Sequence, residues 1–298
     1  MQGTIIKQIS GYYDIAVNGE IIRTRAAGNL RVRKVSPVVG DIAIFTPADD
    51  NGELGYLTGI APRRNVLVRP PVANIDQAVL VTAAAEPSFS SNLLDRFLVY
   101  LEGKNIEPLI YLTKTDLLPD AEYERLQPVL QGYEAVGYKV FAPRVAFATD
   151  TLQALHTIFA DKLTIFTGQT GAGKSTLINH LESGLNLATG EISKSLGRGK
   201  HTTRTTDLYP ADGGLLADTP GFSSLGLLDV SLDDLRDRFP EFVRNAGDCK
   251  FRSCQHVNEP KCAVKAALAA GEIMQSRYDN YLQFRAELSN QRPVYGKN

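Results

Sequence analysis

Gly168-Gln169-Thr170-Gly171-Ala172-Gly173-Lys174-Ser175 is the stretch that decides the fold, because it fits the phosphate-binding pattern G-x-x-x-x-G-K-[ST]. The apolar run 163–167 before it predicts a buried strand, and residues 175–181 after it predict the start of a helix. Glycines let the backbone curl so that successive N–H groups and the helix N-terminus face phosphate oxygens. Strand, loop and helix together indicate a nucleotide-binding loop; the alternative is a Gly-rich turn with no ligand.

The side chains of this loop predict how it would hold a nucleotide. Lys174 is placed to contact the β- and γ-phosphates, and the Ser175 hydroxyl is placed to bind Mg²⁺. Thr176 follows directly and belongs to the same predicted nucleotide-binding set. The loop therefore predicts a nucleoside phosphate bound together with Mg²⁺.

Length and composition are those of an ordinary globular protein of two or three domains. The chain has 298 residues, of which 43% are hydrophobic and 22% are charged, and this balance excludes disordered and fibrous classes. The N-terminus lacks a basic segment followed by an apolar core, and the apolar-rich run 78–85 is too short to cross a bilayer. We therefore expect a cytoplasmic protein with no membrane partner.

The first seventy residues predict a small β-domain. Residues 4–17 and 20–25 are expected to be strands joined at Asn18-Gly19, which is a strong hairpin signal. Further short strands are expected at 41–45 and 55–60. Several short strands with Gly and Asn turns and scattered arginines favour an OB-type barrel that binds RNA, with another small β-domain as the alternative.

The pattern changes after Arg69-Pro70-Pro71, which we interpret as a linker because consecutive prolines forbid helix. Strands are expected at 75–82 and 109–112, with an amphipathic helix over 93–103 between them. Strands that alternate with helices predict an α/β domain with a parallel sheet, whose ligand-binding loops lie at the carboxyl ends of the strands.

Thr113-Lys114-Thr115-Asp116 comes immediately after the second of these strands and resembles the [NT]-K-x-D guanine motif of GTPases. Asp116 would accept hydrogen bonds from N1–H and the N2 amino group of guanine, which adenine cannot donate, and Lys114 would pack along the base. The alternative is that Asp116 caps the N-terminus of a helix. In a chain with a phosphate-binding loop, we interpret the motif as a guanine site.

Two further segments have the character of GTPase switches. Residues 214–218 predict a strand that ends in Asp218-Thr219-Pro220-Gly221, a D-x-x-G motif in which Asp218 holds Mg²⁺ through a water and the Gly221 amide contacts the γ-phosphate. The basic loop 197–204 lacks apolar periodicity, and we expect it to be mobile. Within it, Thr203 is the candidate switch I threonine that senses Mg²⁺ and γ-phosphate, with Thr202 as the alternative.

All three cysteines of the chain lie near the C-terminus in the pattern Cys249-x4-Cys254-x-His256-x5-Cys262. Three thiols and one imidazole at this spacing predict a closed Cys₃His zinc site with no position open for catalysis. Buried cysteines that bind no metal are the alternative. The clustering and odd number of cysteines argue against disulfides and indicate a reducing compartment. Helices are expected at 263–270 and 275–288.

The net charge of −1 hides an uneven distribution. Residues 1–72 hold nine basic residues against six acids, and residues 244–265 hold five against two, so each segment carries +3. Residues 229–241 hold five acids against two arginines, or −3. A solvated surface is the ordinary explanation of such runs, but two basic regions on either side of a nucleotide site indicate an RNA partner.

The order of the motifs gives the most specific resemblance. In ordinary GTPases the phosphate-binding loop comes first, whereas here Thr113–Asp116 precedes Gly168–Ser175, which precedes Thr203 and Asp218–Gly221. With a β-barrel before this circularly permuted core and a Cys₃His site after it, the whole chain closely resembles the RsgA/YjeQ family of GTPases that depend on the small ribosomal subunit.

This resemblance implies an OB-fold RNA-binding domain at 1–70, a circularly permuted P-loop GTPase domain at 71–228 and an α-helical zinc-binding domain at 229–298. It also implies GTP hydrolysis to GDP, stimulated by the 30S subunit, with a role in late 30S maturation and contacts to 16S rRNA. We expect a monomer. The family's guanine loop would fall near residues 141–145, where the sequence shows no recognisable motif.

Two mechanistic hypotheses follow. Phe222 occupies the position after the D-x-x-G motif where other GTPases often have a water-positioning Gln, so His201 is the candidate catalytic residue, with RNA contact as its alternative role. Contact between Gly221 and the γ-phosphate is expected to reposition the zinc domain. Two rival functions remain from the sequence: an RNA-binding module with incidental hydrolysis, and an ATPase or kinase.

Overall fold

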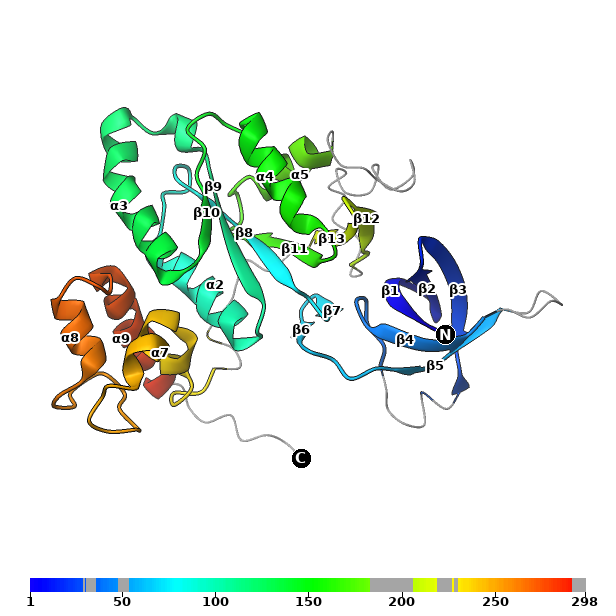
Figure 1. Cartoon of the computed structure of the whole chain (residues 1–298). Coiled ribbons are helices and arrows are strands. Elements are labelled where there is room, and N and C mark those ends of the chain that lie inside the picture. Colours follow the sequence, from blue (N-terminus) through cyan, green and yellow to red (C-terminus); the bar gives the residue numbers. More distant parts are fainter. Residues whose placement is uncertain are drawn as a thin grey trace.

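The structure is a computed structural model of the whole chain (Figure 1). It describes residues 1–28, 30, 36–47, 54–182, 206–218, 227 and 230–290. Within these residues, three parts follow one another along the chain: a β-barrel, an α/β domain and a small helical region.

The N-terminal part is a closed five-stranded barrel. Its strands are β1 (Gln2–Ile9), β2 (Tyr12–Val17), β3 (Glu20–Ala26), β4 (Ile42–Thr46) and β5 (Gly55–Ile60), and they pair in the order β1-β2-β3-β5-β4. Alternate residues such as Ile5, Ile15 and Leu57 fill the interior. The predicted OB-type barrel is confirmed, and so is the hairpin turn at Asn18-Gly19, where both residues have positive φ.

The expectation of a linker at Arg69–Pro71 is wrong. Residues 69 and 70 instead form the turn between two short antiparallel strands, β6 (Val66–Val68) and β7 (Pro71–Ala73). Leu67 and Val72 are fully buried in the same hydrophobic core as residues of the α/β domain. The proline pair therefore shapes a turn, and the apolar residues on either side of it hold the hairpin in place.

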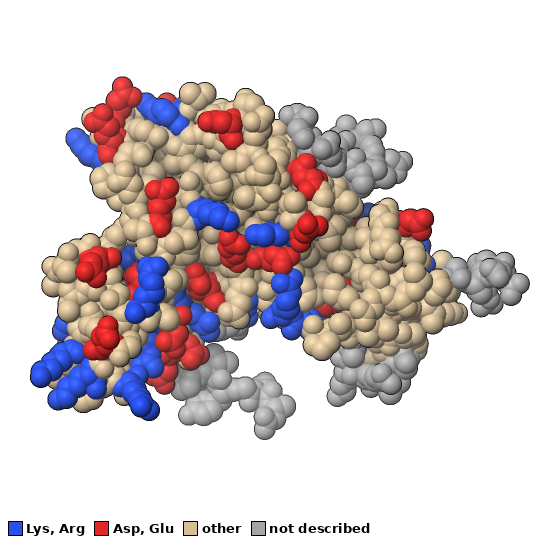
Figure 2. All heavy atoms as spheres, viewed as in Figure 1, with Lys and Arg blue, Asp and Glu red and all other residues tan. Residues whose placement is uncertain are grey.

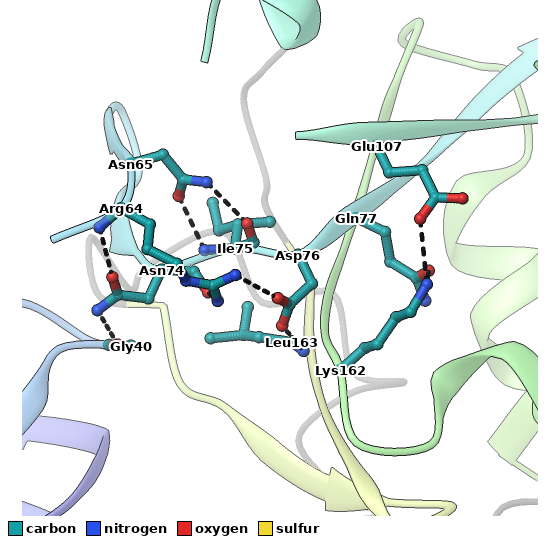
Figure 3. A network of polar contacts seen from close by, with 10 residues as sticks. All are labelled: Gly40, Arg64, Asn65, Asn74, Ile75, Asp76, Gln77, Glu107, Lys162 and Leu163. Atoms are coloured by element: carbon teal, nitrogen blue, oxygen red, sulfur yellow. Dashed lines mark hydrogen bonds and ion pairs between the residues drawn. The ribbon is translucent and has the colours of Figure 1, made fainter. Parts of the chain in front are cut away.

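A network of polar contacts joins this hairpin to both neighbouring parts (Figure 3). The Asn74 amide donates to the Gly40 carbonyl of the barrel at 2.9 Å, and its oxygen accepts from the Arg64 N–H at 2.9 Å. The Arg64 side chain forms a 2.8 Å ion pair with Asp76, which in turn accepts from the Leu163 N–H at 2.8 Å. The network thus connects the barrel to the start of the strand that leads into the phosphate-binding loop.

The central domain is a six-stranded sheet in the order β10-β9-β8-β11-β13-β12, in which only β12 runs antiparallel to its neighbour. Its strands are β8 (Gln77–Ala83), β9 (Glu107–Thr113), β10 (Lys139–Phe141), β11 (Leu163–Gly168), β12 (Tyr209–Ala211) and β13 (Gly214–Asp218). The first helices, α2 (Ser91–Gly103) and α3 (Asp120–Val136), pack on one face, and α4 (Thr149–Phe159) and α5 (Lys174–Glu182) pack on the other (Figure 1). The predicted parallel α/β core is confirmed.

The C-terminal part consists of η2 (Leu235–Arg238), α7 (Pro240–Ala246), α8 (Ala263–Ala269) and α9 (Gln275–Asn290). It packs against α2 through the fully buried Arg277 of α9, which forms ion pairs with Asp95 at 2.7 Å and with Glu241 at 2.5 Å. Asp95 also accepts hydrogen bonds from Tyr133 at 2.9 Å and from Asn280 at 2.7 Å. None of the described helices is long and apolar enough to cross a membrane.

Candidate nucleotide site and metal centre

The predicted phosphate-binding loop lies between a buried strand and a helix, as the motif requires. Strand β11 is buried at every position and ends at Gly168, and α5 begins at Lys174. A Cβ at Gly168 would lie 2.0 Å from the Val81 carbonyl oxygen, so only glycine fits there. Gly171 and Gly173 have φ of +79° and +84°, which side-chain-bearing residues rarely adopt.

The other loop residues divide into buried and exposed positions. The Gln169 N–H donates to the Val81 carbonyl at 3.3 Å and the Ala172 N–H donates to the Gln169 carbonyl at 3.1 Å, which closes the loop. The side chain of Thr170 is exposed in the loop, and those of Ser175 and Thr176 are exposed at the start of α5. The loop therefore presents its hydroxyl groups and a helix N-terminus to solvent, where a phosphate group would bind.

The predicted guanine motif lies beside this loop. Thr113 is the last residue of β9, and its Oγ1 donates to the Ala172 carbonyl at 2.5 Å. Strand β8 separates β9 from β11, so the two motifs meet at the carboxyl edge of the sheet, where the strand order reverses. Ligands of open α/β sheets bind at such a point.

The rest of the motif forms a short turn in which Thr115 is buried and Asp116 is exposed. Lys114 has a left-handed backbone, with φ of 57°, and its Nζ donates to the Glu86 carbonyl. Asp116 is exposed within the 3₁₀ helix η1 (Thr115–Leu117). The alternative that Asp116 caps the N-terminus of a helix is therefore wrong.

A cavity of about 210 Å³ opens beside both motifs. It is lined by Tyr111, Leu112, Thr113, Lys114, Thr115, Asp116, Leu117, Pro143, Ala146, Phe147, Gly173 and Thr176. A purine base bound here would face Asp116 and Lys114, and its phosphates would lie towards Gly173. The cavity brings together residues from three segments that are far apart in the sequence.

The segment 141–147 completes this cavity, although its sequence has no recognisable guanine-loop motif. The Thr115 hydroxyl donates to the Pro143 carbonyl, which attaches the segment to the guanine motif. Arg144 fixes it further, donating to the carbonyls of Thr115 and Leu118 and forming a 2.6 Å ion pair with Asp120. Of residues 141–145, where the family's guanine loop is expected, Pro143 lines the cavity, and Ala146 and Phe147 line it just beyond that range.

Phe147 is the cavity residue that sequence reasoning missed. Its ring stacks on His180 of α5, with ring centroids 3.9 Å apart and an angle of 12° between the planes. Its backbone has φ of 53°, which is unusual for a residue other than glycine. An aromatic side chain supported from behind in this way offers a flat surface to a base.

The predicted switch residues are only partly within the described residues. Asp218 is the last residue of β13, and its backbone pairs with Phe166 of β11, next to the phosphate-binding loop. Thr202, Thr203, His201 and Gly221 lie outside the described residues. The structure thus brings the phosphate-binding loop and the guanine motif together, and their relation to the switch side chains remains a prediction.

The four predicted metal ligands form one cluster. The three thiol sulfurs and one nitrogen of His256 all lie within 4.8 Å of one another. His256 Nδ1 is 3.7 Å from the Cys249 sulfur and 3.4 Å from the Cys262 sulfur. These distances suit four ligands around a single ion with metal–sulfur bonds of about 2.3 Å, so the donor set and its spacing fit a tetrahedral metal.

Hydrogen bonds and ring contacts from neighbouring residues hold the Cys₃His cluster in place. The Tyr278 hydroxyl donates to the His256 carbonyl at 2.7 Å, and Arg236 donates to the Cys254 carbonyl at 2.7 Å. The ring of Phe242 packs edge-on against that of His256, with centroids 5.8 Å apart. Burial raises the pKa of the Cys254 thiol to about 12 and lowers the pKa of His256.

The fold and the site define a circularly permuted P-loop nucleotide-binding protein, because the guanine-type motif precedes the phosphate-binding loop in the chain. A model of the RsgA GTPase matches residues 60–228, and a model of the RsgA N-terminal domain matches residues 2–57. The chain belongs to the RsgA GTPase family.

Relatives of known name and known structure match nearly the whole chain. The small ribosomal subunit biogenesis GTPases RsgA of Latilactobacillus sakei subsp. sakei (strain 23K) and Limosilactobacillus reuteri (strain DSM 20016) are 59% and 53% identical, over 99% of this chain and 98% and 99% of theirs. The crystal structure of YloQ, a circularly permuted GTPase, matches with a TM-score of 0.85 at 39% identity, covering 99% of this chain and 96% of that one. YjeQ from Thermotoga maritima matches with a TM-score of 0.83 at 30% identity, covering 98% and 99%.

Proposed function

We propose that this protein hydrolyses GTP to GDP and phosphate and acts in biogenesis of the small ribosomal subunit. The family and the names of its relatives support this function. The observation that carries it is the hydrogen bond between Thr113 and Ala172, which joins the guanine motif to the phosphate-binding loop around one cavity. The ATPase and kinase alternatives do not account for Asp116 at the rim of that cavity.

Each predicted site residue has a place in this proposal. The backbone of Gly168–Gly173 and Lys174 would bind the phosphates, and Asp116 and Lys114 would bind the guanine. Mg²⁺ would be held by Ser175 and Thr203, and by Asp218 through a water, and would neutralise charge that develops on the phosphates. The Gly221 amide would contact the γ-phosphate. The exposed position of Ser175 at the start of α5 supports its part in this assignment.

His201 is the proposed water-positioning residue. The position after the D-x-x-G motif is Phe222, whose side chain cannot orient water. An imidazole in the loop 197–204 could do so if binding to the ribosomal subunit orders that loop near the γ-phosphate. Because the ribosomal subunit would bring His201 into place, GTP hydrolysis would depend on binding to that subunit.

Zinc is the proposed occupant of the Cys₃His cluster. Its four donors are a nitrogen and three sulfurs, all buried or half-buried, which is the donor set of structural zinc sites. With four protein ligands, such a site would stabilise the loop around residues 249–262 and take no part in catalysis.

The proposed partners are GTP, GDP and the 16S rRNA of the small subunit, which the protein would meet in the cytoplasm as a monomer. Four basic side chains are exposed in and next to the loop that carries the Cys₃His cluster (residues 249–262): Lys250, Arg252, Lys261 and Lys265. Figure 2 shows Lys and Arg gathered over this part of the molecule. Phosphate groups of RNA suit such a surface, since most protein–nucleic acid affinity comes from phosphate contacts.

GTP turnover with and without purified small ribosomal subunits tests the proposal. We expect slow hydrolysis by the protein alone and faster hydrolysis when the subunits are added. Competition of GTP and ATP for the site should show strong preference for GTP. Subunit binding without stimulated phosphate release would favour an RNA-binding module, and equal affinity for ATP would favour an ATPase or kinase.

A further inference from the structure

One row of exposed side chains crosses the outside of the barrel. Tyr12 of β2 pairs with Arg25 of β3, and Arg25 pairs with Tyr56 of β5. Residues paired across neighbouring strands point to the same face of the sheet. All three are exposed, with 38% of Tyr12 and 46% of Tyr56 accessible to solvent. We call these residues the Tyr-Arg-Tyr row.

The alternation of the strands fixes the outward direction of this row. The neighbours Tyr13, Thr24 and Leu57 are buried inside the barrel, so the residues next to them must point out. Ile9 of β1 pairs with Tyr12 and is 49% exposed, which extends the row by one strand. Two phenol rings and an isoleucine are therefore exposed to solvent on the outside of the barrel, where they do not contribute to its hydrophobic interior.

Arg25 gives the row its charge. The neighbouring Arg23 is held by Asp14 at 2.7 Å, whereas no carboxylate pairs with Arg25 in the part of the chain that the structure describes. A guanidinium between two aromatic rings suits a ligand that has flat apolar faces joined by anionic groups. Nucleic acid has this composition, with bases joined by phosphates.

We propose that the Tyr-Arg-Tyr row is a stacking platform for unpaired bases of single-stranded RNA, with Arg25 contacting the phosphate between them. The proposal rests on the proposed function, which makes RNA the partner of this protein. The two tyrosines lie two strand spacings apart, or about 9.6 Å, which leaves room for one base on each ring. Strands 2 and 3 also form part of the surface on which OB-folds bind oligonucleotides.

A duplex fits this row less well than a single strand. The bases of an A-form duplex are stacked on one another, and proteins recognise the duplex by its phosphates and 2′-hydroxyls. Tyr12 and Tyr56 could not stack on bases that remain paired. The chemistry of the row therefore selects loops, bulges or ends of a folded RNA.

The barrel is attached firmly enough for this contact to orient the GTP site. Besides the network in Figure 3, Lys7 of β1 forms a 3.0 Å ion pair with Asp207, and the Leu208 N–H donates to the Ile6 carbonyl at 2.8 Å. Residues 207 and 208 lead into β12 at the edge of the α/β sheet. RNA held by the row would thus lie at a defined position relative to the nucleotide cavity.

Binding of the full chain to a fluorescein-labelled, unstructured RNA of about 12 nucleotides tests the platform, since this length is within the site size of an OB-fold. We expect Tyr12→Ala and Tyr56→Ala each to weaken binding by about 5-fold to 100-fold, the range of base–aromatic stacking. Tyr12→Phe and Tyr56→Phe should bind as the parent protein does, because the ring remains. Ile21→Ala, which removes an exposed side chain elsewhere on β3, is the matched control.

A second measurement reports stacking directly. The chain contains no tryptophan, so Tyr56→Trp introduces a single indole into the row. We expect the single-stranded RNA to quench its fluorescence and a duplex of the same sequence to leave it unchanged. Arg25→Ala should reduce the dependence of binding on salt by roughly one phosphate contact.

Three outcomes would overturn the platform: alanine variants that bind the RNA normally, phenylalanine variants as weak as the alanine variants, or equal quenching by duplex. Loss of binding to a purified ribosomal protein, with RNA binding intact, would instead assign the row to a protein partner. Subunit-stimulated GTP turnover of the parent protein distinguishes failure of the platform from failure of the proposed function. If subunits stimulate turnover and the row variants still bind RNA, only the platform fails; if subunits never stimulate turnover, the proposed function fails.

Discussion

Thr113 and Ala172 join the two halves of the nucleotide site, since the threonine hydroxyl donates to the alanine carbonyl at 2.5 Å. The two residues are 59 positions apart in the chain: Thr113 ends β9, and Ala172 lies in the loop between β11 and α5. The same hydroxyl is 3.2 Å from the Thr82 carbonyl at the end of β8. One buried side chain therefore holds the guanine motif, the phosphate-binding loop and the strand between them in register.

Replacing this hydroxyl should weaken nucleotide binding. Thr113→Val keeps the shape of the side chain but leaves the Ala172 carbonyl without its donor, at a cost of roughly 1–3 kcal/mol for a buried group. We expect affinity for GDP to fall by about 10-fold, measured by titration with a fluorescent GDP analogue. Thr113→Ser, which keeps the hydroxyl, is the control and should bind nearly normally. A valine variant with parental affinity would show that the bond does not shape the site.

Phe147 should contribute to binding of the base. Phe147→Ala removes a ring that lines the cavity and stacks on His180, so we expect weaker binding of both GDP and GTP by about 10-fold, in line with the loss of one aromatic contact of roughly 1–3 kcal/mol. Phe147→Tyr keeps the flat surface and should restore affinity. The same titration measures both variants, and an unchanged alanine variant would place the base elsewhere in the cavity.

The parts of the site that the sequence predicted correctly share a physical reason. The glycines at 168, 171 and 173 occupy positions where a side chain would collide or force an unfavourable φ, so the pattern itself encodes the loop. Four ligands of one metal ion must lie within bonding distance of it, and the three thiols and the imidazole are spaced along the chain so that the fold can bring them together. Where the chemistry of a site requires particular residue types at fixed separations along the chain, a short stretch of sequence is enough to predict the site.

Other parts depend on contacts that no local pattern records. The segment that contains Phe147 is held by hydrogen bonds whose acceptors are the backbone carbonyls of Pro143 and Thr115, and a carbonyl at either position leaves no mark in the sequence. Pro70 and Pro71 suggested a linker, because burial of Leu67 and Val72 depends on the distant core. No local pattern distinguishes Arg277 in the sequence, and only the fold brings it to Asp95, 182 positions away.

Removal of one ligand of the proposed zinc site should loosen the C-terminal helices and leave the nucleotide site intact. Cys254→Ser takes one ligand from the cluster, so we expect purified protein to lose its bound zinc in metal analysis and to melt at a lower temperature. Ser253→Ala, which changes the exposed neighbour, should retain zinc. A serine variant with normal zinc content would contradict the assignment of Cys254 as a ligand.

The ion pair between Arg96 of α2 and Glu287 of α9 should make stability depend on pH. Hydrogen bonds from Arg96, including one of 2.7 Å, lower the pKa of Glu287 below its ordinary value of 4.5. A lowered pKa in the folded state means that the stabilisation is complete above pH 4.5 and is lost as the pH falls through the folded value.

Glu287→Gln tests this dependence. Because Glu287 is partly exposed, its contribution is at most about 1 kcal/mol near neutral pH. In urea unfolding, the variant should be less stable than the parent at pH 7, and the difference should shrink below about pH 4. Asp279→Asn, at an exposed acid of the same helix, is the control. A difference that stays constant across this range would show that the carboxylate charge is not responsible.

The Arg277 network bears on how the C-terminal domain responds to GTP. The hypothesis that γ-phosphate contact at Gly221 repositions this domain requires it to move relative to α2, or to carry α2 with it. Arg277 is fully buried between Asp95 of α2 and Glu241 of α7, and the rings of Tyr133, Tyr138 and Phe239 surround its guanidinium. Separating the domain from α2 would break the ion pair between Arg277 and Asp95 and leave the Asp95 carboxylate without its cation, so we expect α2 and the C-terminal domain to move together.

Arg277→Met should reveal how strongly this network holds the two parts together. The variant keeps the apolar stem of the side chain but leaves two buried carboxylates without their cation, which costs roughly 3–5 kcal/mol. Urea unfolding should show this loss, and adding Asp95→Asn and Glu241→Gln should recover part of it, because the unpaired charges are then gone. Arg285→Met, at a half-buried arginine of the same helix, should cost less than about 1 kcal/mol. If Arg277→Met alone were as mild as this control, the network would not be what joins the C-terminal helices to the GTPase core.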